Sequence, residues 1–288
     1  MRTSPAIDSL LASADLGGLV SLTPVGGGDI SAAWRVECER GTVFAKTGPV
    51  LSESIFSAEA AGLQELAKAD CIRVPAVVSQ GTSGDEAWIA LEWLEMQSSS
   101  PAVDAKLGEQ LAALHRYTAD QYGFYRDTMI GSTPQPNAQK SDWVEFYRLE
   151  RLEFQLRTAR ANGFGGELQT LGRLVIDAVP EFFAGRAPEP SLLHGDLWSG
   201  NKAACDGEPI IFDPAVYYGD RETDLAMSRL FGGFHRSFYE AYESAWSLAD
   251  GHQQRVALYQ LYHVLNHLNI FGSGYLGRSI SLMRSLLD

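Results

Sequence analysis

Residues 193–201 read Leu-His-Gly-Asp-Leu-Trp-Ser-Gly-Asn, and residues 210–213 read Ile-Ile-Phe-Asp. Asp196 and Asn201 have four residues between them, which is the spacing of a kinase-type catalytic loop. Asp213 follows at the end of an apolar run typical of a β-strand. Phosphoryl transfer needs one carboxylate to orient the acceptor hydroxyl and further oxygen ligands to hold a metal ion. The stretch therefore predicts a phosphotransferase, with Asp196 as catalytic base and Asn201 and Asp213 as Mg²⁺ ligands.

A lysine upstream of this stretch fits the same chemistry. Lys46 closes a short run of β-branched and aromatic residues, as does the strand lysine that contacts the α- and β-phosphates of ATP. Residues 54–69 have apolar side chains at helical spacing, and Glu59 lies among small residues that suit an inward-facing surface. We expect Glu59 to pair with Lys46. Two other glutamates of this helix remain alternatives: Glu53 and Glu65.

A glycine-rich turn precedes the lysine strand and comprises Gly26, Gly27, Gly28 and Asp29. Glycines let backbone N–H groups approach phosphate oxygens closely. The run is neither a P-loop nor a complete G-x-G-x-x-G motif, so it is a weak signal by itself. Its place immediately before the lysine strand predicts a loop that covers the phosphates of the nucleotide.

The apolar strand predicted over residues 86–94 leads out of this first region. Extended backbone at such a point can form hydrogen bonds with the edge of an adenine ring. We expect Glu92 and Leu94 to bind the nucleotide there through their main-chain groups. Trp93 between them is more typical of a packing residue than of a specific ligand.

The element pattern predicts an α+β protein with a protein-kinase-like bilobal fold. Residues 1–95 form a small antiparallel-β lobe with one helix that binds the nucleotide, and residues 96–288 form a larger, mainly helical catalytic lobe. A linker at residues 97–100 separates them. Ser100 and Pro101 suit the N-cap and first position of the helix that follows.

The composition excludes several classes of function. The 288 residues carry a net charge of −13, which argues against binding nucleic acid or a membrane surface. No uncharged apolar run is long enough to span a bilayer, and no secretory signal is evident. Cys38, Cys71 and Cys205 lack metal-site spacing and favour reduced thiols in the cytoplasm. We find no long heptad pattern and expect a monomer.

Two further groups of polar residues admit two interpretations each. Asp220, Glu222 and Asp224 could hold a second metal ion, but they precede a predicted helix at 223–231, and we favour a capping role. Asp224 would then brace the backbone of the catalytic loop. His263 and His267 are four residues apart on a predicted helix, as zinc ligands can be. Without an evident third ligand, a polar helix face or a wall of the substrate cleft is favoured.

The motifs together resemble the fructosamine kinase (ketosamine-3-kinase) family, related to the aminoglycoside phosphotransferases. The tryptophan inside the catalytic loop, Trp198, distinguishes this family from its relatives. The resemblance covers about residues 25–276. The matching stretches are 26–31, 56–63, 130–135, 194–201, 212–215, 217–222, 224–227, 230–234 and 258–272.

This resemblance implies ATP-dependent phosphorylation of the sugar C3 hydroxyl of ketosamines, the adducts of fructose- or ribulose-type sugars with amines, which promotes deglycation. It implies that Trp198 packs against the sugar or its amine, and that His194 lies on the substrate side. The acceptor is a small ketosamine or a glycated lysine. The alternatives are a kinase of the same fold that acts on an aminoglycoside, choline or a sugar, and a catalytically silent nucleotide-binding protein.

Overall fold

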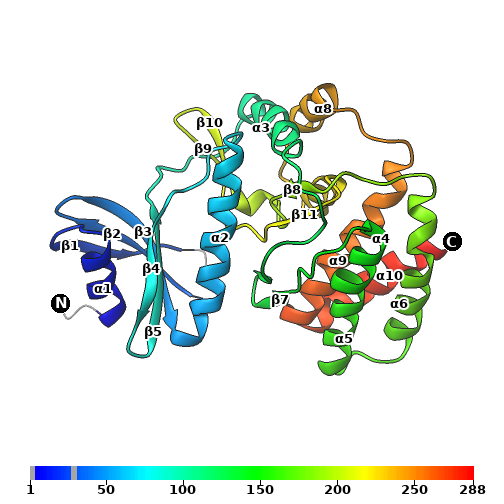
Figure 1. Ribbon diagram of the computed structural model, residues 1–288, viewed down its shortest axis with the longest axis horizontal. Coiled ribbons are helices and arrows are strands. Elements are labelled where there is room, and N and C mark those ends of the chain that lie inside the picture. The colour runs from blue at the N-terminus through cyan, green and yellow to red at the C-terminus, as the bar shows by residue number, and fades with distance from the viewer. Residues whose placement is uncertain (1–3, 27–30) are drawn as a thin grey trace.

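The computed structural model describes residues 4–26 and 31–288 and consists of two lobes (Figure 1). The smaller lobe contains a five-stranded antiparallel sheet with the strand order β1-β2-β3-β5-β4. The strands are β1 Leu19–Pro24, β2 Ala32–Cys38, β3 Gly41–Pro49, β4 Val77–Ser83 and β5 Glu86–Glu92. The predicted lysine strand is thus a central strand, because β3 lies between β2 and β5.

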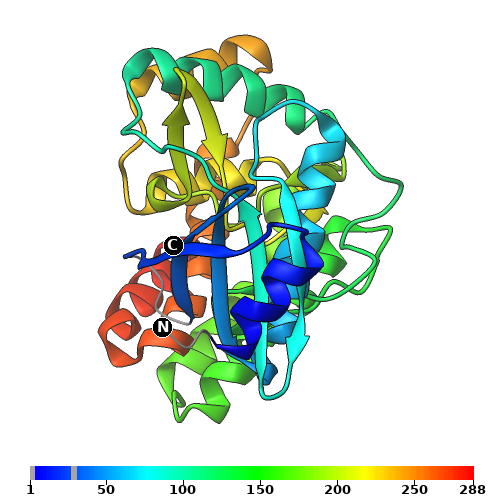
Figure 2. The same cartoon turned by 90° about the vertical axis from the view of Figure 1, so that its left-hand side faces the viewer.

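Alternating side chains give the sheet two apolar faces, and a helix covers each. Helix α2, Glu53–Ala69, places Phe56 and Leu63 against Ile89 and Leu91 of β5. Helix α1, Pro5–Ser13, covers the opposite face with Ile7, and Figure 2 shows it in front of the strands. The prediction of a single helix in this lobe was therefore wrong.

The missed helix α1 carries a recognisable start signal. The Ser4 side chain accepts a hydrogen bond from the Ile7 amide, and Pro5 is the first helical residue. This combination is a favoured helix N-terminus. Its nine residues are too few to show a clear helical period in the sequence, and packing on the sheet stabilises them.

The larger lobe is mainly helical, as predicted, and contains most of the apolar core. Its helices are α3 Pro101–Leu114, α4 Trp143–Phe146, α5 Phe154–Ala161, α6 Glu167–Ala178, α7 Glu222–Leu230, α8 Arg236–Ala245, α9 His252–Phe271 and α10 Leu276–Leu287. The short strands are β6 Thr128–Ile130, β7 Thr133–Gln135, β8 Ser191–Leu193, β9 Lys202–Cys205, β10 Glu208–Ile211 and β11 Tyr217–Gly219. One-turn helices include η1 Val50–Ser52, η3 Val179–Phe183, η4 Ser199–Asn201 and η5 Ser273–Tyr275.

Several details differ from the expected helix boundaries. The single helix expected over residues 143–160 is divided, because a π-helical segment, Tyr147–Glu153, separates α4 from α5. Helix α3 begins as predicted, with the Ser100 hydroxyl accepting from the Val103 amide and Pro101 at the first position. The boundary predicted at residue 95 falls in the connection between β5 and α3.

Contacts between the lobes fix α2 against the larger lobe (Figure 1). The Tyr218 hydroxyl of β11 donates to Glu65 of α2 at 2.8 Å. Gly62 of α2 lies so close to Val216 that an added Cβ would be 3.2 Å from that side chain. On the linker side, Gln97 pairs with Ala204 of β9 through two backbone hydrogen bonds. The helix that carries Glu59 therefore has a fixed position relative to the catalytic loop.

Candidate active site

A cavity of about 810 Å³ lies between the two lobes and contains most of the predicted site. The predicted residues that line it are Gly26, Lys46, Glu59, Glu92, Leu94, Asp196, Trp198, Asn201 and Asp213. Residues 27–29, which complete the predicted glycine-rich loop, lie outside the described residues. Segments that are far apart in the sequence thus meet at one cavity, as the kinase interpretation requires.

Lys46 joins the two lobes through ion pairs. Its Nζ lies 2.9 and 3.0 Å from the two carboxylate oxygens of Glu59 and 2.6 Å from Oδ1 of Asp213. Glu59 is thus the partner of Lys46. Of the alternatives, Glu65 instead binds Tyr218 and Lys68, while Glu53 is exposed in the first turn of α2.

The charges in this cluster depend on one another. Burial opposes the charge of Lys46, but Glu59 and Asp213 outweigh burial and raise its pKa. Burial also opposes the charge of Asp213, yet Lys46 lowers the pKa of that carboxyl below its usual value. Burial raises the pKa of Glu59 while Lys46 lowers it. Because Nζ contacts both Glu59 oxygens, we interpret the pair as carboxylate and ammonium.

Asp196 and Asn201 occupy the loop between β8 and β9. The Asn201 side-chain amide donates to the main-chain oxygen of Asp196 at 3.0 Å and to Asp196 Oδ2 at 3.3 Å. Burial, followed by the charges of Asp213 and Asp224, raises the pKa of Asp196 to about 7, and the Asn201 hydrogen bond lowers it. A carboxylate with such a pKa is suited to exchanging a proton near neutral pH.

The donor set next to Asp196 fits a magnesium ion. The Asn201 amide nitrogen also approaches the Asp213 main-chain oxygen at 3.4 Å, so the side-chain oxygen is the atom left to bind a cation. Asp213 has a left-handed φ of 54°, an uncommon conformation that often marks functional positions. The described residues contain no group of three or more His, Cys, Asp or Glu side chains that could hold a metal. Carboxylate and amide oxygens completed by phosphate and water suit Mg²⁺.

Asp224 braces the catalytic loop, as the sequence predicted. Its Oδ2 accepts from the amide of His194 at 2.8 Å, and its Oδ1 accepts from the amide of Gly195 at 2.9 Å. His115 contacts Oδ2 from the other side at 3.2 Å and also contacts the Tyr242 hydroxyl. His115 was not predicted, because nothing in the sequence near α3 indicates that it lies beneath residues 194–196.

The structure corrects the position expected for His194. Its side chain is fully buried instead of facing a substrate. Nε2 lies 3.0 Å from the carbonyl oxygen of Phe212, while Nδ1 accepts from the Asp196 amide at 3.3 Å. Both ring nitrogens therefore contact backbone next to the two predicted aspartates. His194 thus lies beneath these aspartates and does not line the cavity.

The position of Glu92 also differs in part from the prediction. Its amide donates to the Ala76 carbonyl at 2.8 Å, and its carboxylate lies 3.0 Å from Arg73. That amide is therefore committed within the small lobe and is not available to adenine. Leu94 lines the cavity while its side chain packs on Cys205 and Ile210. A main-chain contact at Leu94 stays a prediction.

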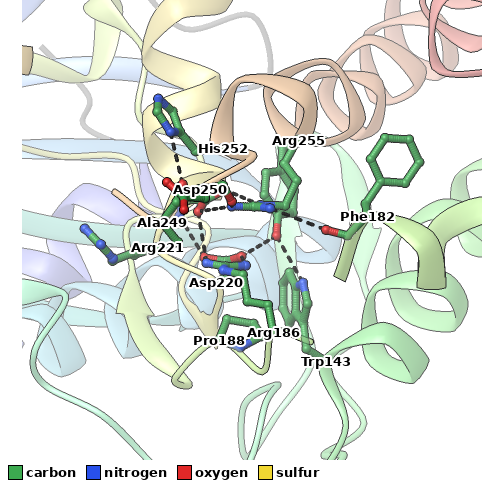
Figure 3. A network of polar contacts seen from close by, with 12 residues as sticks. Trp143, Phe182, Arg186, Pro188, Asp220, Arg221, Ala249, Asp250, His252 and Arg255 are labelled. Carbon is green, nitrogen blue, oxygen red and sulfur yellow. Dashed lines mark hydrogen bonds and ion pairs between the residues drawn. The ribbon is translucent and has the colours of Figure 1, made fainter. Parts of the chain in front are cut away.

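Asp220 and Glu222 are buried and form ion pairs instead of a second metal site. Figure 3 shows Asp220 facing Arg186 in this network. Asp220 binds Arg186 through both oxygens and accepts from the Tyr259 hydroxyl at 2.5 Å. Asp220 also accepts from the Glu222 amide at 3.1 Å, consistent with the predicted capping role. Glu222 pairs with Arg255 at 2.7 and 2.9 Å. These arginines neutralise the carboxylates and leave no place for a cation.

A sequence model described as fructosamine kinase matches residues 10–288 of this chain. The chain belongs to the fructosamine kinase family. It is 40% identical over 267 residues to a Synechocystis protein named "Probable ketoamine kinase", covering 91% of this chain and 89% of that protein. It is 38% identical over 293 residues to a chloroplastic protein-ribulosamine 3-kinase of Arabidopsis thaliana, covering 100% and 89%. Both alignments include the whole catalytic stretch.

Solved structures agree with this membership. A crystal structure of a candidate fructosamine-3-kinase from Thermobifida fusca has a TM-score of 0.89 and 32% identity, covering 100% of this chain and 99% of that one. A ternary complex of an aminoglycoside phosphotransferase with streptomycin and ATP has a TM-score of 0.65 at 13% identity. At that identity the likeness shows the fold alone, which is α+β and kinase-like as predicted. No helix within residues 4–26 and 31–288 is long and apolar enough to cross a membrane.

Proposed function

We propose that this protein transfers the γ-phosphoryl group of ATP to the sugar C3 hydroxyl of a ketosamine, with Mg²⁺. The observation that carries the proposal is the meeting of Asp196, Asn201 and Asp213 with the Lys46–Glu59 pair at one cavity. The phosphorylated adduct then decomposes and frees the amine. Names of the relatives, ketoamine kinase and protein-ribulosamine 3-kinase, support this substrate class.

Each residue has one task in this reaction. Asp196 accepts the proton of the acceptor hydroxyl, for which its raised pKa suits it. Lys46, held by Glu59, binds the phosphates and neutralises their charge. Asn201 and Asp213 would hold Mg²⁺, which supplies charge neutralisation at the transferred phosphoryl group. The aromatic ring of Trp198, which lines the cavity next to Asp196, packs against the acceptor.

The protein works as a single chain on a small ketosamine or a glycated lysine side chain. All of the proposed site residues come from this one chain, so the chemistry requires no second copy. The three cysteines are free thiols, which supports a reducing compartment such as the cytoplasm. Three similar plant proteins are named chloroplastic, so relatives work in another compartment.

Product analysis tests the proposal directly. The purified protein is incubated with ATP, Mg²⁺ and Nε-fructosyl-lysine or Nε-ribulosyl-lysine, and the product is identified by mass and by phosphorus NMR. We expect a ketosamine 3-phosphate. Transfer to an aminoglycoside, choline or a free sugar, with no transfer to ketosamines, would favour another small-molecule kinase of this fold. ATP binding without transfer to any acceptor would identify a silent nucleotide-binding protein.

A further inference from the structure

A row of aromatic rings leads away from the catalytic loop. Trp198 contacts the edge of Phe231 with ring centroids 6.2 Å apart, and Phe231 lies 4.9 Å from His267. His267 is 5.5 Å from Phe271 and 5.1 Å from Tyr275. We name these five residues the ring row. They come from the catalytic loop, the end of α7, the end of α9 and η5.

The ring row is open to solvent and begins two residues after the proposed base. Trp198 is 37% exposed, Phe231 38% and Phe271 54%. Trp198 and Phe271 both line the cavity. Aromatic side chains grouped in this way at a cleft are more often a binding surface than a random exposure. The row therefore extends the site on the side where an acceptor enters.

Contacts with neighbouring residues restrict the orientation of the Trp198 ring. A Cβ added to Gly200 would be 2.3 Å from the Trp198 ring, so the indole lies directly across this glycine. The edge-to-face contact with Phe231 gives the indole a second neighbour. A ring that is already ordered loses little entropy when it covers a ligand. The part of the row nearest to Asp196 is therefore preorganised.

The charges along the row point to one type of occupant. Burial lowers the pKa of His267, which keeps its ring neutral at physiological pH. Neutral aromatic faces attract a cation and cover alkyl chains. Beside Phe231 lies Arg278, an exposed cation whose guanidinium is 5.9 Å from the Phe231 ring and donates to the Leu230 carbonyl. A carboxylate on the acceptor would be attracted to this guanidinium.

We propose that the ring row, with Arg278, is a subsite for the amine part of the acceptor. The occupant is an ω-amino carboxylate, with its ammonium against Trp198, its alkyl stem along Phe231 and its carboxylate at Arg278. This inference rests on the proposed function, since it assumes a ketosamine whose sugar hydroxyl lies at Asp196. It selects adducts of a long-chain amine, such as the lysine side chain.

The chemistry of the two ends of a ketosamine supports this orientation. Sugar hydroxyls need hydrogen-bonding partners, and an aromatic row offers few of them. The ammonium and the methylene groups of the amine part match aromatic faces without such partners. A sugar placed along the row would leave its hydroxyls to water, whereas at Asp196 the reacting hydroxyl meets a carboxylate. The amine part is therefore the portion that the row fits.

Three acceptors with the same fructosyl group test the subsite. They are the fructosyl adducts of methylamine, pentylamine and 6-aminohexanoate. The pentylamine adduct adds an alkyl stem to the methylamine adduct, and the 6-aminohexanoate adduct adds a carboxylate to the end of that stem. We expect kcat/KM to rise about tenfold from the methylamine to the pentylamine adduct, because four methylenes become partly covered. We expect a further rise of about threefold for the 6-aminohexanoate adduct, which falls as salt is added.

Variants show which residue causes each rise in kcat/KM. Phe231→Ala should reduce the preference for pentylamine over methylamine to about twofold, while Phe231→Leu should retain most of it. Arg278→Gln should abolish the preference for the carboxylate, and Arg278→Lys should restore part of it. Arg284→Gln is the matched control, because Arg284 lies on the same helix and pairs with Glu167. Ratios measured on one preparation do not depend on the fraction that is folded.

The outcomes separate this inference from the proposed function. If all three adducts are phosphorylated with equal kcat/KM, the subsite is wrong while the proposed function stands. The same holds if Phe231→Ala and Arg278→Gln leave the preferences of the unmodified protein unchanged. If neither these fructosyl adducts nor their ribulosyl counterparts are phosphorylated although ATP binds, the proposed function itself fails, and the subsite fails with it.

Discussion

The two halves of the cavity are built in different ways. In the half beneath β3, Lys46 and Glu59 are largely enclosed charges, and the partly exposed Asp213 pairs with Lys46 from the other side. The other half is the ring row, whose aromatic side chains are partly exposed and neutral. Enclosed charges interact strongly and tolerate little displacement, whereas an apolar surface accepts ligands of varied shape. The first half suits a fixed reaction, and the second suits the choice of acceptor.

The two halves of the cavity also differ in the contacts that hold their residues in position. The backbone of the catalytic loop is held from below by Asp224, which accepts two amide hydrogen bonds and contacts His115. The ring row is supported mainly by ring contacts and by Gly200 under Trp198. Changes in the charged half should therefore affect every acceptor equally. Changes in the ring row should alter the preference among acceptors.

The largest effect is expected at Asp196. Asp196→Asn keeps the shape of the side chain but removes the group that accepts the proton, so kcat should fall by about 10²–10⁴-fold. The loss should be the same for the methylamine and 6-aminohexanoate adducts, because it concerns the reacting hydroxyl. Steady-state kinetics with both acceptors measure it.

Asp206→Asn provides the control for this change. Asp206 is an exposed aspartate in the turn between β9 and β10, and its positive φ of 54° suits asparagine. It should retain full activity. Equal turnover by Asp196→Asn and the unmodified protein would show that Asp196 does not handle the proton.

A smaller loss is expected at Glu59. Glu59→Gln removes the charge that draws Lys46 away from Asp213, and Lys46 would then be displaced toward the metal ligand. Misplacing a positioning group costs about 10²-fold in kcat/KM, and KM for ATP should rise. Glu53→Gln on the same helix is the control, since Glu53 is exposed in the first turn of α2 and lies outside the ion-pair cluster. An unchanged KM for ATP would contradict the proposal that Lys46 binds the phosphates of ATP.

The third effect concerns the support of the catalytic loop. Asp224→Asn replaces one acceptor oxygen by a donor, so one of the two loop amides loses its partner. We expect about 1.5–3 kcal/mol less free energy of unfolding and a lower kcat for every acceptor. Asp220→Asn, which weakens the pair with Arg186, should destabilise the fold without changing kcat of the folded protein. Equal kcat losses in the two variants would refute a specific role for Asp224.

The catalytic half could be predicted from the sequence because its residues lie close together in the chain. Asp196, Asn201 and Asp213 are separated by fixed short spacings, and the strand before Lys46 shows its type by composition. Glu59 could be chosen among three glutamates because its neighbours are small. The tasks of these residues in catalysis stay predictions.

The remaining features depend on contacts between distant segments. The family resemblance placed His194 on the substrate side, yet its burial beneath Phe212 decides its task. The ring row joins positions 198, 231 and 271, and no local pattern links them. Helix α1 is short and stabilised by packing on the sheet. Such features follow from tertiary structure, which spacing alone does not reveal.

The smallest effect on activity, and a clear effect on stability, is expected at His263. This residue of α9 is fully buried, lies one turn from His267 of the ring row, and has no hydrogen-bond partner for either ring nitrogen within the described residues. Burial lowers its pKa from 6.5 to about 3. Between these values the unfolded chain binds one more proton than the folded protein. The contribution of His263 to stability is therefore present above pH 6.5 and is lost as the pH falls below it.

His263→Leu should remove this dependence. Below pH 6.5, one proton on His263 makes the free energy of unfolding of the unmodified protein fall by about 1.4 kcal/mol per pH unit. In the variant, the slope measured by urea titrations should be shallower by this amount. Some slope remains, because burial also lowers the pKa of His115 and His194. Gln260→Leu on the same helix should change stability but leave the slope as it was. A shallower slope with unchanged acceptor preference would show that His263 affects stability and not selectivity, while an unchanged slope would mean that His263 is hydrated.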